Sequence, residues 1–278
     1  MGPGRSLGPV GENALRVREY GAAGPLVFVL HGGPGSPGHM APVARGLADI
    51  CHVLEPFERR SGREPLTVAR HVADLRELVE KRCQGDRPAL VGSSWGAMLA
   101  LAFAAKHPEL VRRIALVGCG TFGEEARRQF QMTLGRRIQP DLQRKLERIA
   151  DESTDPDERL MRAARLLLPS VYSYDLLTQD TEIASCDAKG HAETWSDMLR
   201  QQSEGEYPAS FAAIKAPVLM LHGSHDPHPG RSIAASLRPY LPQLEYHELE
   251  RCGHFPWLER HAREDFFHRL RAWLVHGG

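Results

Sequence analysis

The segment Gly92-Ser93-Ser94-Trp95-Gly96 constrains the fold of this chain most strongly. It directly follows the apolar run ALVG and directly precedes AMLALAFAAKH, a run typical of a helix. A serine on so tight a turn between a strand and a helix lies in strained backbone, and the residues two positions before and after it must be small. Gly92 and Gly96 meet this demand. We therefore predict that Ser94 is a nucleophile, with an ordinary Gly/Ser turn as the alternative.

The rest of the chain alternates short apolar runs with amphipathic stretches, which favours a mostly parallel, doubly wound sheet covered by helices. The expected strands are Leu15–Tyr20, which is more polar and expected nearer an edge, Leu26–His31, Cys51–Leu54, Ala89–Gly92, Ile114–Val117, Val218–Leu221 and Leu244–Leu249. Apolar residues at helical spacing predict two helices that pack on this sheet. They are Val68, Val72, Leu75 and Val79, behind the expected N-cap Thr67, and Phe266, Phe267, Leu270, Trp273 and Leu274.

The alternation stops between about residues 121 and 207. This segment has no convincing strand, is rich in charged and helix-favouring residues, and is interrupted at Pro140, Pro156 and Pro169. We therefore expect an α/β fold with an inserted helical cap. The predicted core comprises residues 1–120 and 207–278, and the predicted cap comprises residues 121–206.

Composition narrows the classes of function. The 35 Lys and Arg residues balance the 35 Asp and Glu residues and are scattered, so the basic footprint of a nucleic-acid or membrane-surface protein is missing. The five cysteines are an odd number without CxxC spacing, the start of the chain does not resemble a signal peptide, and no apolar run approaches the roughly 20 residues that cross a bilayer. We expect a cytoplasmic protein that acts on a small-molecule or short-peptide substrate, without a nucleic-acid or membrane partner. The sequence leaves the oligomeric state open.

A serine nucleophile needs a base within hydrogen-bond reach, and the base needs an orienting partner. Asp226 follows the apolar run VLMLHG, and His254 follows the run LEYHELE, so both lie just past the ends of expected strands. Either residue alone would be an ordinary surface Asp or loop His. Because both follow the turn in the order Ser, Asp, His, we predict that Ser94, Asp226 and His254 form a catalytic triad.

The segment His31-Gly32-Gly33-Pro34-Gly35 directly follows the expected strand LVFVL. The oxyanion of a tetrahedral intermediate must be met by backbone N–H groups, one from the residue after the nucleophile and one from a loop after an early strand. We predict Trp95 and Gly33 as these donors, since Pro34 has no N–H. A Gly/Pro turn without chemistry is the alternative.

These three motifs, HGGPG, SSWG and the GHFPWLE around His254, resemble the proline iminopeptidase branch of the α/β-hydrolase superfamily. The superfamily resemblance covers about residues 15–117 and 217–275. It implies a sheet of the α/β-hydrolase type, supports the triad Ser94, Asp226 and His254 with the oxyanion donors Gly33 and Trp95, and implies cleavage of a small ester or amide through an acyl-enzyme without a cofactor.

The chain departs from that branch at one segment. Where those peptidases usually carry D-Q-R-G-x-G-R-S, this sequence has EPFERRSG at residues 55–62. The peptidases also hold the free amine of the substrate with acidic groups near the cap. The acids of the predicted cap that could do so, which the sequence does not sort into pocket and surface, are Asp187, Glu193, Asp197, Glu204 and Glu206. A carboxylesterase or lactonase, or a non-catalytic ligand-binding protein of this fold, are therefore alternatives to a proline iminopeptidase-like activity.

A cluster of histidines near Asp226 could also be interpreted as a set of metal ligands. His222, His225 and His228 surround this residue in the sequence. The run begins at a strand end, where alternation is expected to point its side chains apart, and Asp226 already has a role. We therefore predict no metal.

Overall fold

The computed structural model describes residues 5–7, 15–179 and 181–276, and it confirms the α/β class with a mostly parallel sheet. The remaining residues of the predicted core, 1–4, 8–14 and 277–278, lie outside the described ranges. In spatial order the strands are β1 (Arg5–Leu7), β2 (Val17–Tyr20), β4 (His52–Pro56), β3 (Leu26–Leu30), β5 (Ala89–Ser93), β6 (Arg113–Val117), β7 (Val218–Gly223) and β8 (Leu244–Leu249). The pairs β1–β2 and β2–β4 are antiparallel, and all others are parallel.

All seven predicted strands are present, and β2, the more polar one, lies next to the edge strand β1. The strand β1 was not predicted, because three residues are too short to show an alternating pattern. The central strands are buried on both faces: Phe28 and Leu30 pack into one hydrophobic cluster, and Val27 and Val29 into the other. This two-sided burial explains why these strands appear in the sequence as continuous apolar runs.

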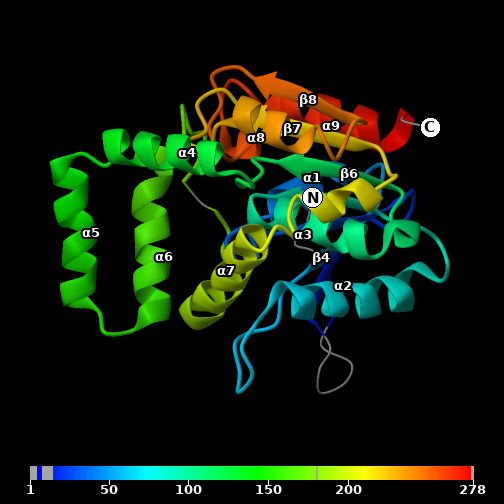
Figure 1. Cartoon of the computed structure of the whole chain (residues 1–278), viewed down its shortest axis with the longest axis horizontal. Helices are drawn as coiled ribbons and strands as arrows, with labels where there is room; N and C mark the ends of the chain where they lie inside the picture. The colour runs from blue at the N-terminus through cyan, green and yellow to red at the C-terminus, as the bar shows by residue number, and fades with distance from the viewer. Residues whose placement is uncertain (1–4, 8–14, 180, 277–278) are drawn as a thin grey trace.

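Helices cover both faces of the sheet (Figure 1). On one face lie α2 (Val68–Cys83), α3 (Trp95–Lys106) and α8 (Gly230–Leu237), and on the other lie α1 (Ala41–Leu47) and α9 (Arg263–His276). The predicted N-cap is confirmed, since Oγ1 of Thr67 accepts a hydrogen bond of 3.2 Å from the N–H of Arg70. No helix in the described ranges is long and apolar enough to span a bilayer.

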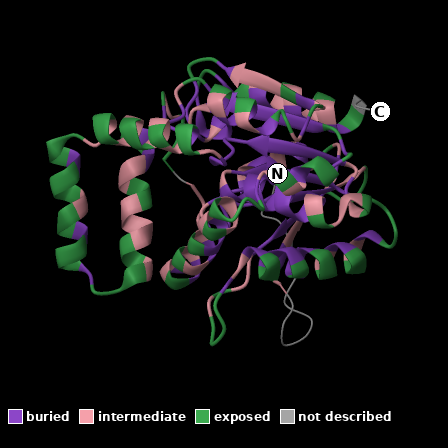
Figure 2. Ribbon diagram, in the orientation of Figure 1, coloured by how far each residue is buried: buried purple, intermediate pink, exposed green. Residues whose placement is uncertain are grey.

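Helices dominate the segment between β6 and β7. They are α4 (Glu124–Arg137), α5 (Pro140–Glu152), α6 (Pro156–Leu167), a π-helical turn (Leu168–Tyr172), α7 (Ala188–Ser203) and a 3₁₀ turn (Ala209–Ala213); further 3₁₀ turns elsewhere are Pro108–Leu110 and Pro256–Leu258. Pro140 and Pro156 are the first residues of α5 and α6, where a missing N–H has no cost. The helices α5 and α6 stand clear of the sheet; α5 is largely exposed, and α6 is mostly half-buried (Figures 1 and 2). The division into core and cap at the stated boundaries stays a prediction.

The two glycines that flank Ser94 allow strand β5 and helix α3 to approach each other. A Cβ atom on Gly92 would lie 2.2 Å from the main-chain oxygen of Gly96, and one on Gly96 would lie 2.2 Å from that of Leu30. These neighbours are backbone atoms that cannot rotate away. The close approach therefore requires glycine at both positions.

We expect the substitution Gly92→Ala to lower the free energy of unfolding by at least about 3 kcal/mol, because it forces strand and helix apart. Urea denaturation followed by circular dichroism measures this. Gly135→Ala is the matched control, since a Cβ there meets no atom within 4 Å. In the exposed helix α4 it should be stabilising by up to about 1 kcal/mol. Equal stability of the two variants would contradict the packing argument.

Candidate active site

Ser94 lies at the sharp turn between β5 and α3, as the sequence predicts. Its φ of 54° and ψ of −113° place a non-glycine residue in strained backbone. Three backbone hydrogen bonds hold this conformation. The N–H of Ser94 donates to the oxygen of Val117 (2.9 Å), and the main-chain oxygen of Ser94 accepts from the N–H groups of Ala97 (3.1 Å) and Met98 (3.3 Å). The side chain remains partly exposed. The turn thus presents a hydroxyl at the start of a buried helix.

The glycine loop after β3 packs directly against this turn. A Cβ atom on Gly32 would lie 2.9 Å from the Cβ of Ser94. The N–H of Gly32 is not available to a ligand, because it donates to Nε2 of His39 (3.0 Å). Burial lowers the pKa of His39 to about 3, so this ring is neutral and can accept. Among the described residues, no hydrogen bond engages the N–H of Gly33 or Trp95, the two predicted oxyanion donors.

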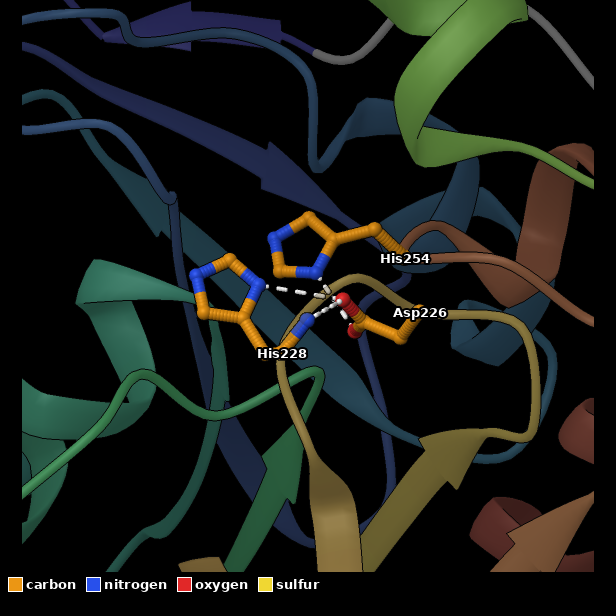
Figure 3. A group of neighbouring side chains, drawn as sticks. All are labelled: Asp226, His228 and His254. Carbon is orange, nitrogen blue, oxygen red and sulfur yellow. Dashed lines mark hydrogen bonds and ion pairs between the residues drawn. The ribbon is translucent and has the colours of Figure 1, made fainter. Parts of the chain in front are cut away.

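Asp226 and His254 lie in the loops that follow β7 and β8, and the structure brings them into contact. Nδ1 of His254 lies 2.6 Å from Oδ2 of Asp226, and both residues are buried (Figure 3). Burial alone would raise the pKa of Asp226. The facing imidazoles of His254, His222 and His228 outweigh it and hold this pKa well below its usual value. Asp226 is therefore an anion that can orient a base.

The end of strand β6 brings Ser94 and His254 to the same place. The N–H of Ser94 is bonded to the oxygen of Val117, the last residue of that strand. The next residue, Gly118, packs against the imidazole: a Cβ there would lie 3.0 Å from Nδ1 of His254. The three predicted triad residues thus gather at the carboxyl edge of the sheet, as parallel strands require.

The expectation that the histidines near Asp226 point apart was wrong for two of them. The loop after β7 turns back, so that Nε2 of His222 lies 3.2 Å from Oδ2 of Asp226 and Nδ1 of His228 lies 3.0 Å from Oδ1. His225 instead packs against the ring of Tyr174. Strand alternation does not apply once the strand has ended.

Potential metal ligands also lie together at this position. In the described part of the chain, Asp226, His228 and His254 are a group with potential ligand atoms within 4.8 Å of one another. Hydrogen bonds already engage both carboxylate oxygens and Nδ1 of both rings. The arrangement is therefore that of a carboxylate that holds imidazoles, and we assign no ion to it.

Three of the five acids of the predicted cap bind a loop of the core. Asp187 accepts from the hydroxyl of Ser61 (2.8 Å), and the other two cap the backbone before and at the start of α2. Those two contacts are Glu193 with the N–H of Leu66 and Asp197 with the N–H of Val68, both at 2.9 Å. Glu204, which pairs with Arg200, and Glu206 are exposed. Asp187, Glu193 and Asp197 are thus already engaged by the protein.

Glu58, which the sequence analysis did not select, buttresses the serine turn. Its carboxylate accepts from Nε1 of Trp95 (2.6 Å) and from the N–H of Gly35 (3.3 Å), so it links the turn to the glycine loop. Burial by itself would raise the pKa of Glu58. The neighbouring His31 and His71, together with these two donors, have the larger effect, so the pKa of Glu58 lies below its usual value. The sequence feature that could have identified Glu58 is its position just past the end of β4, at the same sheet edge as Ser94.

Glu259 positions the loop of the predicted base. It is fully buried and accepts hydrogen bonds from the N–H groups of Gly253 (3.0 Å), Tyr174 (2.8 Å) and Asp175 (2.7 Å). It therefore ties the backbone beside His254 to the segment after the π-helical turn. Glu259 is the last residue of the GHFPWLE motif, but the motif by itself does not show that this side chain is buried.

Four aromatic or Met residues of the segment between β6 and β7 differ in how close they lie to the site: Tyr172, Tyr174, Trp195 and Met198. Only Tyr172 reaches the site among these four. Its ring centroid lies 5.4 Å from that of His254, and its main-chain oxygen accepts a hydrogen bond from the backbone N–H of His254 (2.7 Å). Met198 is fully buried in the core, Trp195 packs beside that core, and Tyr174 is exposed. Packing in the core thus accounts for Met198 and Trp195.

Comparisons with known proteins show what this chain is similar to. Over 197 residues the chain is 28% identical to the 2-hydroxy-6-oxononadienedioate/2-hydroxy-6-oxononatrienedioate hydrolase of Paraburkholderia phymatum, a match that covers 68% of this chain and 62% of that enzyme. Over 200 residues it is 29% identical to the proline iminopeptidase of Neisseria gonorrhoeae, covering 68% of this chain and 60% of that enzyme. The match thus spans less than two thirds of the length of both relatives.

Similarity in structure and a family model extend over more of the chain. A carboxylesterase structure from Nitrososphaera gargenis superposes with a TM-score of 0.68 at 16% identity and covers 98% of each chain, which shows the shared fold. The model of the alpha/beta hydrolase family matches residues 26–267. The chain therefore belongs to the alpha/beta hydrolase family.

Proposed function

We propose that this protein is a serine hydrolase that cleaves a small ester by an acyl-enzyme mechanism. The observation that carries the proposal is the buried hydrogen bond of 2.6 Å between His254 and Asp226, at the sheet edge where Ser94 occupies its strained turn. A neutral imidazole that donates from Nδ1 keeps its lone pair on Nε2. That lone pair is the one that a serine hydroxyl requires.

In the proposed mechanism, Ser94 attacks the carbonyl carbon while Nε2 of His254 takes its proton. The oxyanion that forms lies between the free amides of Gly33 and Trp95, and the start of helix α3 stabilises its negative charge. The imidazolium then protonates the leaving group. A water molecule activated by His254 releases the acyl group and restores the serine.

An ester is favoured over a peptide with an N-terminal proline. An aminopeptidase needs acidic groups that are free to bind the substrate amine. Asp187, Glu193 and Asp197 are already occupied by backbone and hydroxyl donors of residues 61–68. The aromatic side chains of Tyr172 and Phe255 also pack against His254, and such side chains suit an uncharged group.

Hydrolysis of a carbon–carbon bond beside a keto group is the second candidate. The similarity to the hydrolase of Paraburkholderia phymatum, whose named substrate carries a 6-oxo group, favours it. The same two amides could receive the oxyanion formed at a ketone. A substrate of this kind is a dicarboxylate, however, and would need cationic partners that an ester does not.

The proposal is tested by a paired assay of a short-chain aryl ester and a prolyl anilide, before and after treatment with a fluorophosphonate. We expect turnover of the ester, loss of that turnover on labelling, and a kcat/KM for the anilide at least about 100-fold lower, because Asp187, Glu193 and Asp197 are already engaged by the protein. Comparable cleavage of both substrates would establish an aminopeptidase instead. Absence of both turnover and labelling would point to a ligand-binding protein.

A further inference from the structure

A second imidazole shares the carboxylate of the proposed triad. Both the N–H and Nδ1 of His228 contact Oδ1 of Asp226, at 2.9 and 3.0 Å, whereas His254 contacts Oδ2. The two rings are stacked, with centroids 4.7 Å apart and an interplanar angle of 26°. Figure 3 shows both rings on the same side of Asp226, with their second ring nitrogens directed away from it.

The position of His228 is fixed from three directions. The ring of Phe130, from helix α4, stacks on the ring of His228 with centroids 4.1 Å apart, and the ring of His254 stacks on it as well. Its main-chain oxygen lies 2.9 Å from Nε2 of His222. Burial lowers the pKa of His228, so the ring is neutral. Its single proton belongs on Nδ1, because the facing carboxylate can only accept.

We propose that His228 is a positioning residue for the triad. By donating twice to Oδ1, it fixes the plane of the carboxylate and leaves Oδ2 for the close contact with His254 and the longer one with His222, while its ring supports the stacked imidazole. This inference rests on the proposed function of Ser94 and His254. It adds that His228 engages Oδ1, and with it part of the negative charge of the carboxylate, while His254 and the more distant His222 face Oδ2.

The donor and the ring of His228 can be separated by substitution. His228→Phe keeps an aromatic ring between Phe130 and His254 but removes the Nδ1 donor. His228→Asn keeps a donor at the position of Nδ1 but removes the ring. The backbone N–H remains in both variants. If the donor to Asp226 matters, the Asn variant should resemble the wild type more closely than the Phe variant does.

Other charged or titratable groups near the pair are the same in all variants. They are His222 and His225 from β7 and the loop after it, Tyr246 from β8, Arg137 from α4, Tyr172 from the π-helical turn, His39 from the glycine loop, and the thiols of Cys119 and Cys252. A difference between the Phe and Asn variants therefore reports on residue 228 itself.

The experiment measures the pKa of His254 by NMR titration of the imidazole, together with the pH profile of kcat/KM on an aryl ester. Loss of the donor concentrates charge on Oδ2, which stabilises the imidazolium. In His228→Phe we expect the pKa of His254, and the acidic limb of the profile, to rise by about one unit. We expect kcat to fall about ten-fold with little change in KM, and both effects to be largely reversed in His228→Asn.

The outcomes are distinct from those that test the proposed function. If the wild type neither turns over the ester nor reacts with a fluorophosphonate, the proposed function fails, while the NMR titration still decides whether His228 tunes His254. An unchanged pKa of His254 in a folded His228→Phe variant would overturn the inference. An Asn variant no closer to the wild type than the Phe variant would overturn it as well.

Discussion

Replacing Ser94 with alanine is expected to lower kcat on an aryl ester by at least about 10⁵-fold, because the acyl-enzyme can no longer form. Folding should be unaffected, since the hydroxyl is partly exposed and the hydrogen bonds of this residue that hold the turn come from its backbone. Steady-state kinetics measure the loss, and circular dichroism with thermal denaturation monitors the fold. Fluorophosphonate labelling should disappear in the same variant.

Ser93→Ala is the matched control for this substitution. Ser93 is the neighbouring residue, is fully buried, and its hydroxyl has no hydrogen-bond partner among the described residues. Its removal should leave kcat within about three-fold of the wild type, as for a substitution that breaks no interaction. Retention of activity by Ser94→Ala would overturn the assignment of the nucleophile.

The parts of the structure that were predicted correctly depend on local patterns. Strands buried on both faces are continuous apolar runs, and the turn at Ser94 needs glycine on both sides because backbone atoms lie 2.2 Å from the missing Cβ positions. The loops that carry Asp226 and His254 could be placed because parallel strands bring their carboxyl ends to one edge. These inferences need no knowledge of how distant loops fold.

The residues that were missed depend on the path of loops. His228 faces Asp226 because the loop after β7 turns back, which the alternation rule for strands cannot describe. Glu259 is buried because three N–H groups converge on it from two segments separated by more than 70 residues. A single sequence contains no signal for such contacts, and burial of an acid goes against its usual preference.

The segment between β6 and β7 contributes to the geometry of the proposed site. The main-chain oxygen of Tyr172 accepts a hydrogen bond from the backbone N–H of His254. The carboxylate of Asp187 accepts from the hydroxyl of Ser61, and the backbone N–H of Asp187 donates to the main-chain oxygen of Gly35. Both the loop of the proposed base and the glycine loop are therefore held by this segment. A change in this segment should therefore alter the positions of the proposed catalytic groups.

The substitution Asp226→Asn should lower kcat by about 10³- to 10⁴-fold with an intact fold, as loss of the correct tautomer does in other triads. Here the structure predicts how the amide will lie. The backbone N–H and the ring of His228 both donate to Oδ1, at 2.9 and 3.0 Å, so the amide oxygen must stay there and the NH₂ group must face His254.

An NH₂ group opposite Nδ1 forces the proton of His254 onto Nε2, which can then no longer take a proton from Ser94. Kinetics on the aryl ester measure the loss, and ¹⁵N NMR of the imidazole should show protonation at Nε2 instead of Nδ1. The control is Asp141→Asn, on an exposed side chain of α5. A variant at position 226 that kept both the Nδ1 tautomer and its activity would show that this carboxylate does not orient the base, because no other described acceptor contacts Nδ1 of His254.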